Sequence, residues 1–312
     1  MYIVMPGELE AHSIQPVNSD DTLLFIKPNI PMVPQLSTVQ SFDQFEVVVP
    51  ESWADPDKDR FARDIHDAVN TILISRNTIN GLSDIWSENA FQNHDASMAA
   101  IPIDKIDEST KPALIIGSGA GCAEKVNESE YTSYASWSAR NYWFQPDYLG
   151  QCDPREPERF TKMPKKGVIF SPVASPKFLL AYPSKPRYVY FDRGNRLAWR
   201  YAEKRGLSDH RPICGHVADM LVNCAIYAGH KKICLLGIDL ACATEVELRK
   251  YHPYVQDITP VYNYHGELVF TDEIFLTFFR GLQETVNRFP DIEFVTKSGS
   301  GLIIEGVPYA PY

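Results

Sequence analysis

Residues 213–240 of this chain read ICGHVADMLVNCAIYAGHKKICLLGIDL and predict a helix followed by a strand. The first half repeats apolar residues at the spacing of one helical face, which predicts a helix. Gly229 ends it, because glycine adopts a left-handed cap without strain, and His230, Lys231 and Lys232 bring positive charge to the negative end of the helix dipole. The helical face comprises Val217, Met220, Leu221, Cys224, Ala225 and Ala228.

A continuous apolar run, Ile233–Ile238, follows and predicts a strand buried on both faces. Asp239 comes directly after it. A helix, a buried strand and then a carboxylate form half of a nucleotide-binding α/β unit, in which ligands bind at the carboxyl ends of the strands. We therefore expect Asp239 to lie on that rim.

The rest of the chain supports an α/β fold with a Rossmann-like, doubly wound, mostly parallel sheet, because strand and helix patterns alternate. Residues 101–312 are expected to form this nucleotide-binding domain, and residues 1–100 a small N-terminal extension with helices. We expect residues 241–264 to be irregular, and a helix to begin at Thr271 and Asp272. Strands are predicted at Thr22–Ile26, Phe45–Val49, Ala113–Ile116, Thr132–Trp137, Tyr148–Gln151, Val168–Ser171, Tyr188–Phe191, Ile292–Val295 and Leu302–Ile304, and two helices are predicted around Phe61–Ile72 and Ile79–Phe91.

Composition argues against a nucleic-acid-binding, a membrane-spanning and a secreted protein. The 312 residues include 30 Lys and Arg against 40 Asp and Glu, a net charge of −10, which disfavours binding to nucleic acid through phosphate contacts. No apolar run approaches the ~20 residues that span a bilayer, and the N-terminus lacks a signal-peptide pattern, so a cytoplasmic location is expected. Six cysteines without C-x-x-C spacing indicate structural thiols rather than a metal site.

A glycine cluster follows the predicted strand at Ala113–Ile116. Gly117, Ser118, Gly119, Ala120 and Gly121 leave backbone N–H groups free and allow a phosphate to approach, and a following helix would add its dipole. The cluster is neither a full dinucleotide fingerprint, because Cys122 stands in the sixth position, nor a Walker motif. The alternative is a tight turn without a ligand.

Cys214, Gly215 and His216 open the central helix and offer a second set of backbone donors. The alternative is that Gly215 only permits close packing between a strand and a helix.

Two carboxylates and one histidine are the candidate catalytic groups. Asp153 and Asp239 are expected at carboxyl ends of strands, where they could hold Mg²⁺ and phosphate or bind a sugar hydroxyl, although Asp153 before Pro154 is also typical of a turn. His265, in a loop, is a candidate general acid or base, and a solvated histidine is the alternative. His252 and its neighbouring tyrosines could stack on a base or sugar.

Five segments together resemble one family: KPALIIGSGAG (111–121), PDYLGQCDP (146–154), the stretch from 212 to 241, YHGELVFTDEIFLTFFRGLQ (264–283) and GSGLIIEGV (299–307). They look like the bacterial motility accessory factor glycosyltransferases and the archaeal 6-hydroxymethylpterin diphosphokinase. TINGLSDIWSENAFQNH (78–94) resembles the helix that precedes this domain in the bacterial members. The central helix and strand are also similar to Campylobacter-type sialyltransferases.

The resemblance implies a transferase with a nucleotide or nucleotide-sugar donor. By position, residues 117, 119 and 121 match the nucleotide-phosphate loop, residues 214–216 the second turn, and Asp153 and Asp239 the rim acids. The favoured function is glycosyl transfer, with a CMP-linked nonulosonic acid as donor and a protein, glycan or small alcohol as acceptor. One alternative is an ATP-dependent diphosphokinase with Mg²⁺. The other is a non-catalytic nucleotide-binding module, because Gly-Ala-Gly-Cys replaces the family's Gly-Pro-Ser-Leu and removes the phosphate-binding serine.

Overall fold

The computed structural model describes residues 2–4, 23–25, 46–48, 54–139, 142–155, 163–191, 195–206, 216–253, 255 and 257–311. The chain divides into two compact units, Met1–Gly81 and Leu82–Tyr312. None of the helices in these ranges is both long and apolar enough to cross a membrane.

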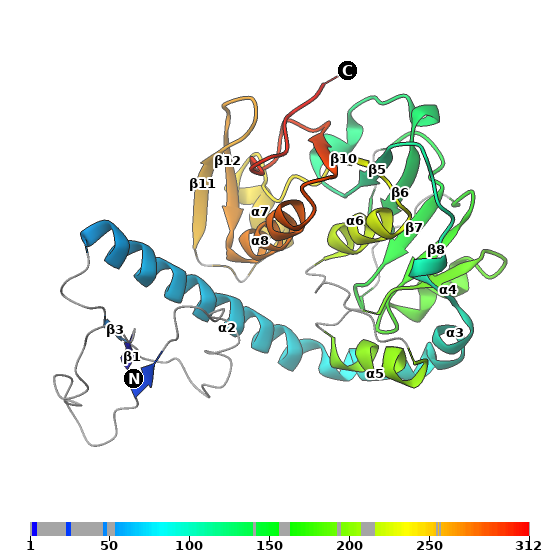
Figure 1. Ribbon diagram of the computed structural model, residues 1–312, viewed down its shortest axis with the longest axis horizontal. Helices are drawn as coiled ribbons and strands as arrows, with labels where there is room; N and C mark the ends of the chain where they lie inside the picture. The colour runs from blue at the N-terminus through cyan, green and yellow to red at the C-terminus, as the bar shows by residue number, and fades with distance from the viewer. Residues whose placement is uncertain are drawn as a thin grey trace. The chain divides into compact units, whose positions relative to one another are not determined.

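The first unit holds a three-stranded parallel sheet in the order β2-β1-β3. Two of its strands confirm the predictions around residues 22–26 and 45–49. Its helix, α2, continues through Gly81 to Gln92 (Figure 1), so the two helices predicted from the sequence are one. No proline lies between the two predicted helices, so no residue there removes a helical hydrogen bond and separates them. These elements are β1 (Tyr2–Val4), β2 (Leu23–Phe25), β3 (Glu46–Val48) and α2 (Asp55–Gln92).

The second unit is built on an eight-stranded sheet in the order β13-β10-β5-β6-β7-β8-β9-β4, in which every pairing is parallel. This confirms the predicted mostly parallel α/β sheet. The strands are β4 (Ile101–Pro102), β5 (Ala113–Ile116), β6 (Thr132–Ser136), β7 (Tyr148–Gln151), β8 (Gly167–Phe170), β9 (Arg187–Val189), β10 (Lys232–Leu236) and β13 (Glu293–Thr296).

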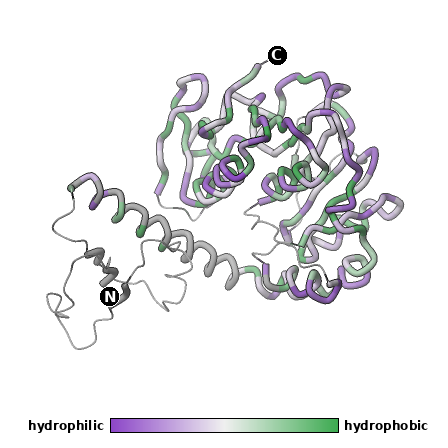
Figure 2. The backbone as a smooth tube through the Cα atoms, in the orientation of Figure 1, coloured by the Kyte–Doolittle hydropathy of each residue, from purple (hydrophilic) through white to green (hydrophobic). Residues whose placement is uncertain are grey.

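Both faces of this sheet are apolar. Along β5, Ala113 and Ile115 belong to the core on one face, and Leu114 and Ile116 to the core on the other. Because strand side chains alternate between faces, an unbroken apolar strand needs helices on both sides. Figure 1 shows α6 and α8 on one face, and Figure 2 shows the apolar residues concentrated in the strands and inner helices. The helices are α3 (His94–Ala99), α4 (Pro176–Ala181), α5 (Arg196–Lys204), α6 (Val217–Tyr227), α7 (Glu245–Tyr251) and α8 (Glu273–Arg288).

The central helix α6 ends as predicted. Gly229 has a φ of +79°, its N–H bonds to the Ile226 carbonyl, and the His230 N–H bonds to the Ala225 carbonyl. This is a Schellman cap. The prediction that His230 brings positive charge to the end of α6 is wrong, however, because the His230 side chain is buried. Its Nδ1 donates to the Lys111 carbonyl at 2.6 Å, and its Nε2 accepts from the Tyr134 hydroxyl at 3.0 Å.

Two further expectations differ from the structure. Residues 241–264 are not irregular, because they contain α7 and β11 (Ile258–Tyr262), which pairs antiparallel with β12 (Leu268–Asp272). The predicted closing strand at 302–304 is absent from the described residues, where Leu302 makes only an isolated bridge to Asn263. The helix predicted after Asp272 is confirmed as α8, and Asp272 is its N-cap.

Candidate functional site

The strand order reverses direction between β5 and β10. From β5 the chain adds β6, β7, β8 and β9 in one direction, and it then returns through α5 and α6 to place β10 on the other side of β5. At such a reversal the loops after the two strands diverge, and in open α/β sheets ligands bind there, beyond the carboxyl ends of the strands. The glycine loop after β5 and Asp239 after β10 both lie at this position.

The loop from Gly117 to Gly121 packs closely against the end of β10. The Gly117 N–H bonds to the Leu236 carbonyl, and the Gly119 N–H bonds to the Gly237 carbonyl, both at 2.8 Å. A Cβ atom at Gly119 would lie 2.5 Å from Asp239 Oδ2, and one at Gly117 would collide with the Gly237 carbonyl. Close packing therefore explains these two glycines, and the expectation that the cluster leaves its backbone N–H groups free is wrong for them. Ser118 and Ala120 are exposed to solvent.

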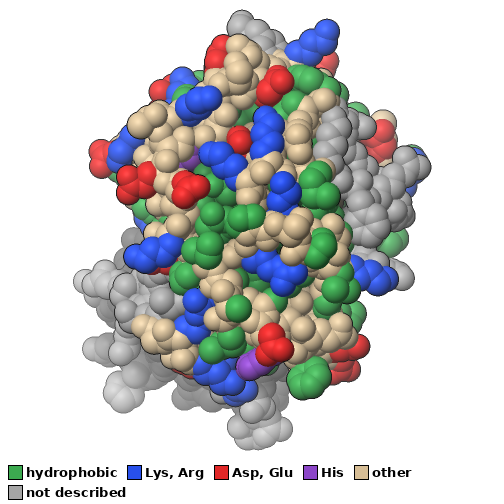
Figure 3. Space-filling view, turned by 90° about the vertical axis from the view of Figure 1, so that its right-hand side faces the viewer, with side chains coloured by type: hydrophobic (Ala, Val, Ile, Leu, Met, Phe, Trp, Pro, Cys, Tyr) green, Lys and Arg blue, Asp and Glu red, His purple; other side chains and the backbone are tan. Residues whose placement is uncertain are grey.

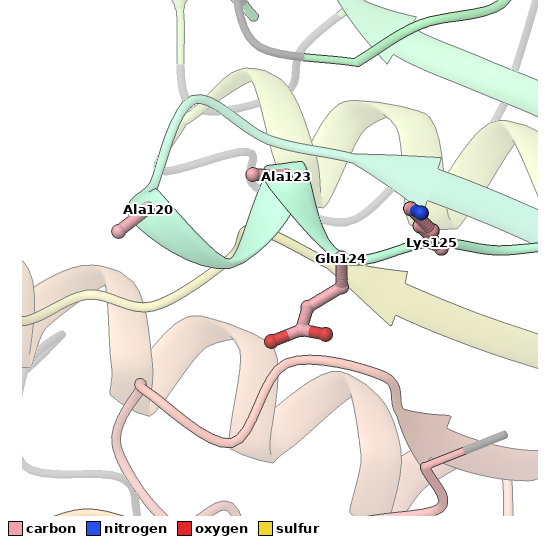
Figure 4. Close-up of a pocket in the computed structure, with 4 residues that line it drawn as sticks. All are labelled: Ala120, Ala123, Glu124 and Lys125. Atoms are coloured by element: carbon pink, nitrogen blue, oxygen red, sulfur yellow. The ribbon is translucent and has the colours of Figure 1, made fainter.

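The element after this loop is a short 3₁₀ helix, η2 (Ala120–Ala123). The expectation that a full helix would add its dipole here is wrong, because four residues in 3₁₀ geometry form a single turn. An open hollow of about 360 Å³ lies beside η2, and Ala120, Ala123, Glu124 and Lys125 line it. Figure 4 shows the Glu124 carboxylate extending from η2 toward the C-terminal segments of the fold.

Asp239 joins three loops at the carboxyl edge. The side chain is 3% exposed. Its Oδ2 accepts a hydrogen bond from the Gly121 N–H at 3.0 Å, and its Oδ1 accepts one from Ser298 Oγ at 2.7 Å. The Asp239 carbonyl also accepts from the Leu302 N–H at 2.8 Å. A buried carboxylate that is satisfied in this way fixes the loops around it.

Ser298 begins a second glycine-serine loop, Ser298–Gly301, after β13. The Ser298 hydroxyl bonds to the Ser300 hydroxyl at 2.9 Å, and a Cβ atom at Gly301 would lie 2.6 Å from Asp239 Cα. This loop was not among the binding residues predicted from the sequence, although it shows the same signal as Gly117–Gly121, a small polar cluster directly after a predicted strand. The missing information was that β13 lies beside β10.

His265 lies against this second loop. Its ring packs over Gly299, where any side chain would collide with it, and it meets the Tyr309 ring edge-on at 5.0 Å between centroids. The His265 N–H bonds to Asn263 Oδ1 at 2.9 Å. The residue is exposed. The structure thus brings His265, Asp239 and the glycine loop to one edge of the sheet.

Asp153 lies apart from that group. It follows β7, which β5 and β6 separate from β10. Three strand spacings amount to about 14 Å, so Asp153 and Asp239 do not lie together around one ion. The Asp153 carboxylate instead binds Arg155 Nε and Nη2, both at 3.1 Å, and this hydrogen bonding raises the pKa of the arginine. Among the described residues, no group of three or more His, Cys, Asp and Glu side chains is arranged to hold a metal ion.

His216 caps α6 at the same edge, whereas Cys214 and Gly215 lie outside the described residues. The His216 Nδ1 accepts a hydrogen bond from the Asp219 N–H at 3.0 Å, so in the neutral ring Nε2 carries the proton. The ring packs edge-on against Phe278 of α8, at 4.8 Å between centroids.

A second histidine packs on α8 and is paired with a buried carboxylate. His252 Nδ1 donates to Asp272 Oδ2 at 2.5 Å, and its ring contacts Phe275 at 4.6 Å. Asp272 is completely buried, and its Oδ1 accepts the Phe275 N–H as the cap of α8. Because the aspartate holds the proton on Nδ1, the lone pair of the neutral ring is on Nε2. This is the arrangement of a histidine oriented as a general base.

Cys242 lies near both Asp239 and Asp272, the partner of His252, because both carboxylates act on its thiol. Burial first, and then the charges of Glu247, Asp272 and Asp239, raise the pKa of its thiol to about 11. The Thr271 hydroxyl, next to Asp272, donates to the Leu240 carbonyl at 2.8 Å. Leu240 directly follows Asp239 and has a φ of +51°. Residues other than glycine seldom adopt this left-handed backbone conformation.

The fold is shared with a solved structure, the MAf glycosyltransferase from Magnetospirillum magneticum AMB-1. The match has a TM-score of 0.59 and 16% sequence identity, and it covers 92% of this chain and 48% of that one. This chain thus spans about half the length of that protein. A sialyltransferase from Campylobacter jejuni, solved with the substrate analogue CMP-3FNeuAc, matches with a TM-score of 0.35 and 12% identity, covering 65% of this chain and 87% of that one.

The first match establishes the α/β fold alone, and the second is too distant to support an argument. No protein-family model matches the sequence, and no curated protein sequence resembles it closely enough to count as a relative. Any function therefore has to be argued from the site.

Proposed function

We propose that this chain is a glycosyltransferase that moves a sugar from a nucleotide-activated donor to an acceptor hydroxyl. The observation that carries the proposal is the meeting of two glycine-serine loops around Asp239, at the strand reversal of a sheet with the fold of a glycosyltransferase. The resemblance noted in the sequence favours a CMP-linked nonulosonic acid as the donor.

The exposed side of the Gly117–Gly121 loop is the proposed binding place of the donor phosphate. Because the N–H groups of the three glycines are bonded within the fold, the donors proposed for the phosphate are the backbone N–H groups of Ser118 and Ala120. Asp239 takes a positioning role in this proposal, since its buried carboxylate holds the loop by the Gly121 N–H. Asp153, bound to Arg155, contributes to substrate binding only if the acceptor reaches β7.

The proposed chemistry is direct displacement. The acceptor oxygen forms a bond to the anomeric carbon, the bond from that carbon to the donor phosphate breaks, and CMP leaves. His252 Nε2 takes the proton of the acceptor hydroxyl, since Asp272 fixes the proton of the neutral ring on Nδ1. His265, over Gly299, is the second candidate for this proton transfer.

The experiment is a calorimetric titration with CMP, CDP, UDP and ADP, each with and without Mg²⁺. We expect CMP to bind without Mg²⁺. The variant Ala120→Asp places a negative charge on the exposed loop and is expected to weaken CMP binding at least tenfold, whereas Ala99→Asp, at an exposed site on α3, is expected to leave it unchanged. Binding of ADP alone, and only with Mg²⁺, would replace the proposal with the diphosphokinase, and failure of all four nucleotides to bind would reject it.

A further inference from the structure

One segment of this acidic chain carries basic residues and no acidic ones. The protein carries 30 basic and 40 acidic residues, yet the 29 residues from Met163 to Phe191 contain five Lys or Arg and no Asp or Glu. The segment covers β8, α4 and β9 at one side of the large sheet. Its charge of +5 stands against a total of −10 for the chain.

The fold gathers these cations at the amino ends of β8 and β9. Lys165 and Lys166 immediately precede β8, and Lys185 Nζ donates to the Lys165 carbonyl at 3.2 Å. Arg187 Nη2 donates to the Leu179 carbonyl at 3.3 Å, which ties the start of β9 to α4. None of these four side chains has a carboxylate of the described residues within 4 Å. Lys166 Nζ lies over the ring of Tyr148, 5.7 Å from its centroid.

Apolar side chains protrude among the lysines. Leu180 is 73% exposed and Met163 is 47% exposed. Leu180 lies three residues after Lys177 on α4, so the two share a face of that helix. Figure 3, which views this side of the molecule, shows lysines and arginines interleaved with hydrophobic side chains across the middle of the face. We call Met163, Lys165, Lys166, Lys177, Leu180 and Lys185 the β8–α4 surface.

We propose that the β8–α4 surface binds the anionic face of a phospholipid bilayer. Lysines attract anionic headgroups from within a Debye length, and aliphatic side chains between them insert into the interface. A protein partner is less well matched, because lysine is depleted in protein interfaces, where aromatic residues and arginine are enriched. A nucleic acid would gain nothing from the exposed Leu180.

This inference does not depend on the proposed function, but the two are compatible. Lys165, Lys166 and Lys185 of the β8–α4 surface lie at the amino ends of the strands, whereas the Gly117–Gly121 loop and Asp239 lie at the carboxyl ends. Strands of four to five residues separate these edges by about 15 Å. A bilayer bound at one edge therefore leaves the other edge open to substrates.

The test is co-sedimentation of the full chain with vesicles of phosphatidylcholine alone or with 30% phosphatidylserine. We expect binding to the anionic vesicles only, and at least tenfold weaker binding in 0.5 M than in 0.1 M NaCl. Lys165→Glu with Lys166→Glu should weaken it at least tenfold, since each charge near the surface is worth about fivefold, and Leu180→Ser should weaken it severalfold.

The matched control is Lys231→Glu with Lys250→Glu, the same change of charge at exposed sites on other elements. It is expected to retain binding. No binding to anionic vesicles at 0.1 M NaCl, or equal losses in the two double variants, would overturn the proposal. Stronger binding to RNA than to vesicles, abolished by the first double variant, would assign the surface to nucleic acid instead. Far-UV circular dichroism of each variant checks that the fold is kept.

Discussion

The hydroxyl of Ser298 donates a hydrogen bond to the carboxylate of Asp239, with 2.7 Å between Oγ and Oδ1, and both side chains are buried. The bond joins the loop after β13 to the loop after β10. The other oxygen of the Asp239 carboxylate, Oδ2, accepts a hydrogen bond from the N–H of Gly121, in the loop after β5. Three loops at the strand reversal therefore depend on one carboxylate.

Replacing Ser298 by alanine removes the donor and leaves Asp239 Oδ1 buried without it. We expect the free energy of unfolding to fall by about 1–3 kcal/mol, measured by urea denaturation at pH 7. Ser184→Ala, at an exposed position before β9, should change it by less than about 0.5 kcal/mol. An unchanged unfolding midpoint for Ser298→Ala would contradict the structural role of this bond.

Gly119→Ala tests the fit of the glycine loop against Asp239. The new Cβ atom would lie 2.5 Å from Asp239 Oδ2, so the loop must shift. We expect CMP affinity to fall at least tenfold, as measured by calorimetry. Gly301→Ala, which would crowd Asp239 Cα from the neighbouring loop, should have a similar effect, and full affinity in both variants would show that the loop does not position the donor.

Gly81→Ala should stabilise the chain. Gly81 lies inside α2, and apart from its neighbours in the helix backbone no atom of the described residues lies within 4 Å of the position that a Cβ would take. Alanine in a helix interior is more favourable than glycine by about 0.5–1 kcal/mol. A rise of that size in the free energy of unfolding is expected, and a fall would mean that α2 is not helical at this residue.

Removing the His252 base should lower turnover and spare binding. With a CMP-sugar donor, His252→Gln is expected to reduce kcat by about 10²–10⁴-fold, while CMP affinity is retained. Asp272→Asn keeps an N-cap for α8 but loses the carboxylate that orients the ring, and it should reduce kcat less. If His265→Gln causes the larger loss, the proton acceptor is His265.

His230 should make stability depend on pH. Burial lowers its pKa below 6.5, the carbonyl of Lys111 partly opposes the shift, and nearby Lys166 adds to it. Between the lowered value and 6.5 the unfolded chain binds more protons than the folded one, so stability is full above about pH 6.5 and is lost as the pH falls.

The measurement is the free energy of unfolding between pH 7.5 and pH 5. His230→Gln should flatten part of the decline, because it removes the group that must protonate. His94→Gln, on the exposed side of α3, is the control and should keep the slope. A slope that is identical in all three proteins would exclude His230 as its source.

Local sequence pattern was sufficient for the elements with strong periodicity. The six-residue apolar run predicted β10, and the helical face with Gly229 predicted α6 and its end. These signals are short-range, and tertiary contacts reinforce them. By contrast, β4 has only two residues and forms because β9 offers an unpaired edge, which no local pattern encodes.

Only the part of the site that local sequence pattern marks could be predicted. Gly117–Gly121 and Asp239 follow strands directly, so their edge could be anticipated. Ser298 and the His252–Asp272 pair could not, because their partners are 59 and 20 residues away in the chain. His230 was misassigned because the pattern shows a charge after a helix, whereas the fold places that ring beneath Tyr134.

Two buried asparagines, one near the end of α2 and one directly after it, bind the loops that follow β7 and β8. The Asn89 side-chain amide donates to the carbonyls of Pro154 and Val173, and that of Asn93 donates to those of Pro172 and Ala174. The four accepting carbonyls lie outside the β-strands, and two side-chain amides at and just after the end of α2 donate to them. A truncated protein that starts after residue 93 would leave these oxygens without those donors, so any shortened version meant for crystallisation or for assays has to begin upstream of Asn89.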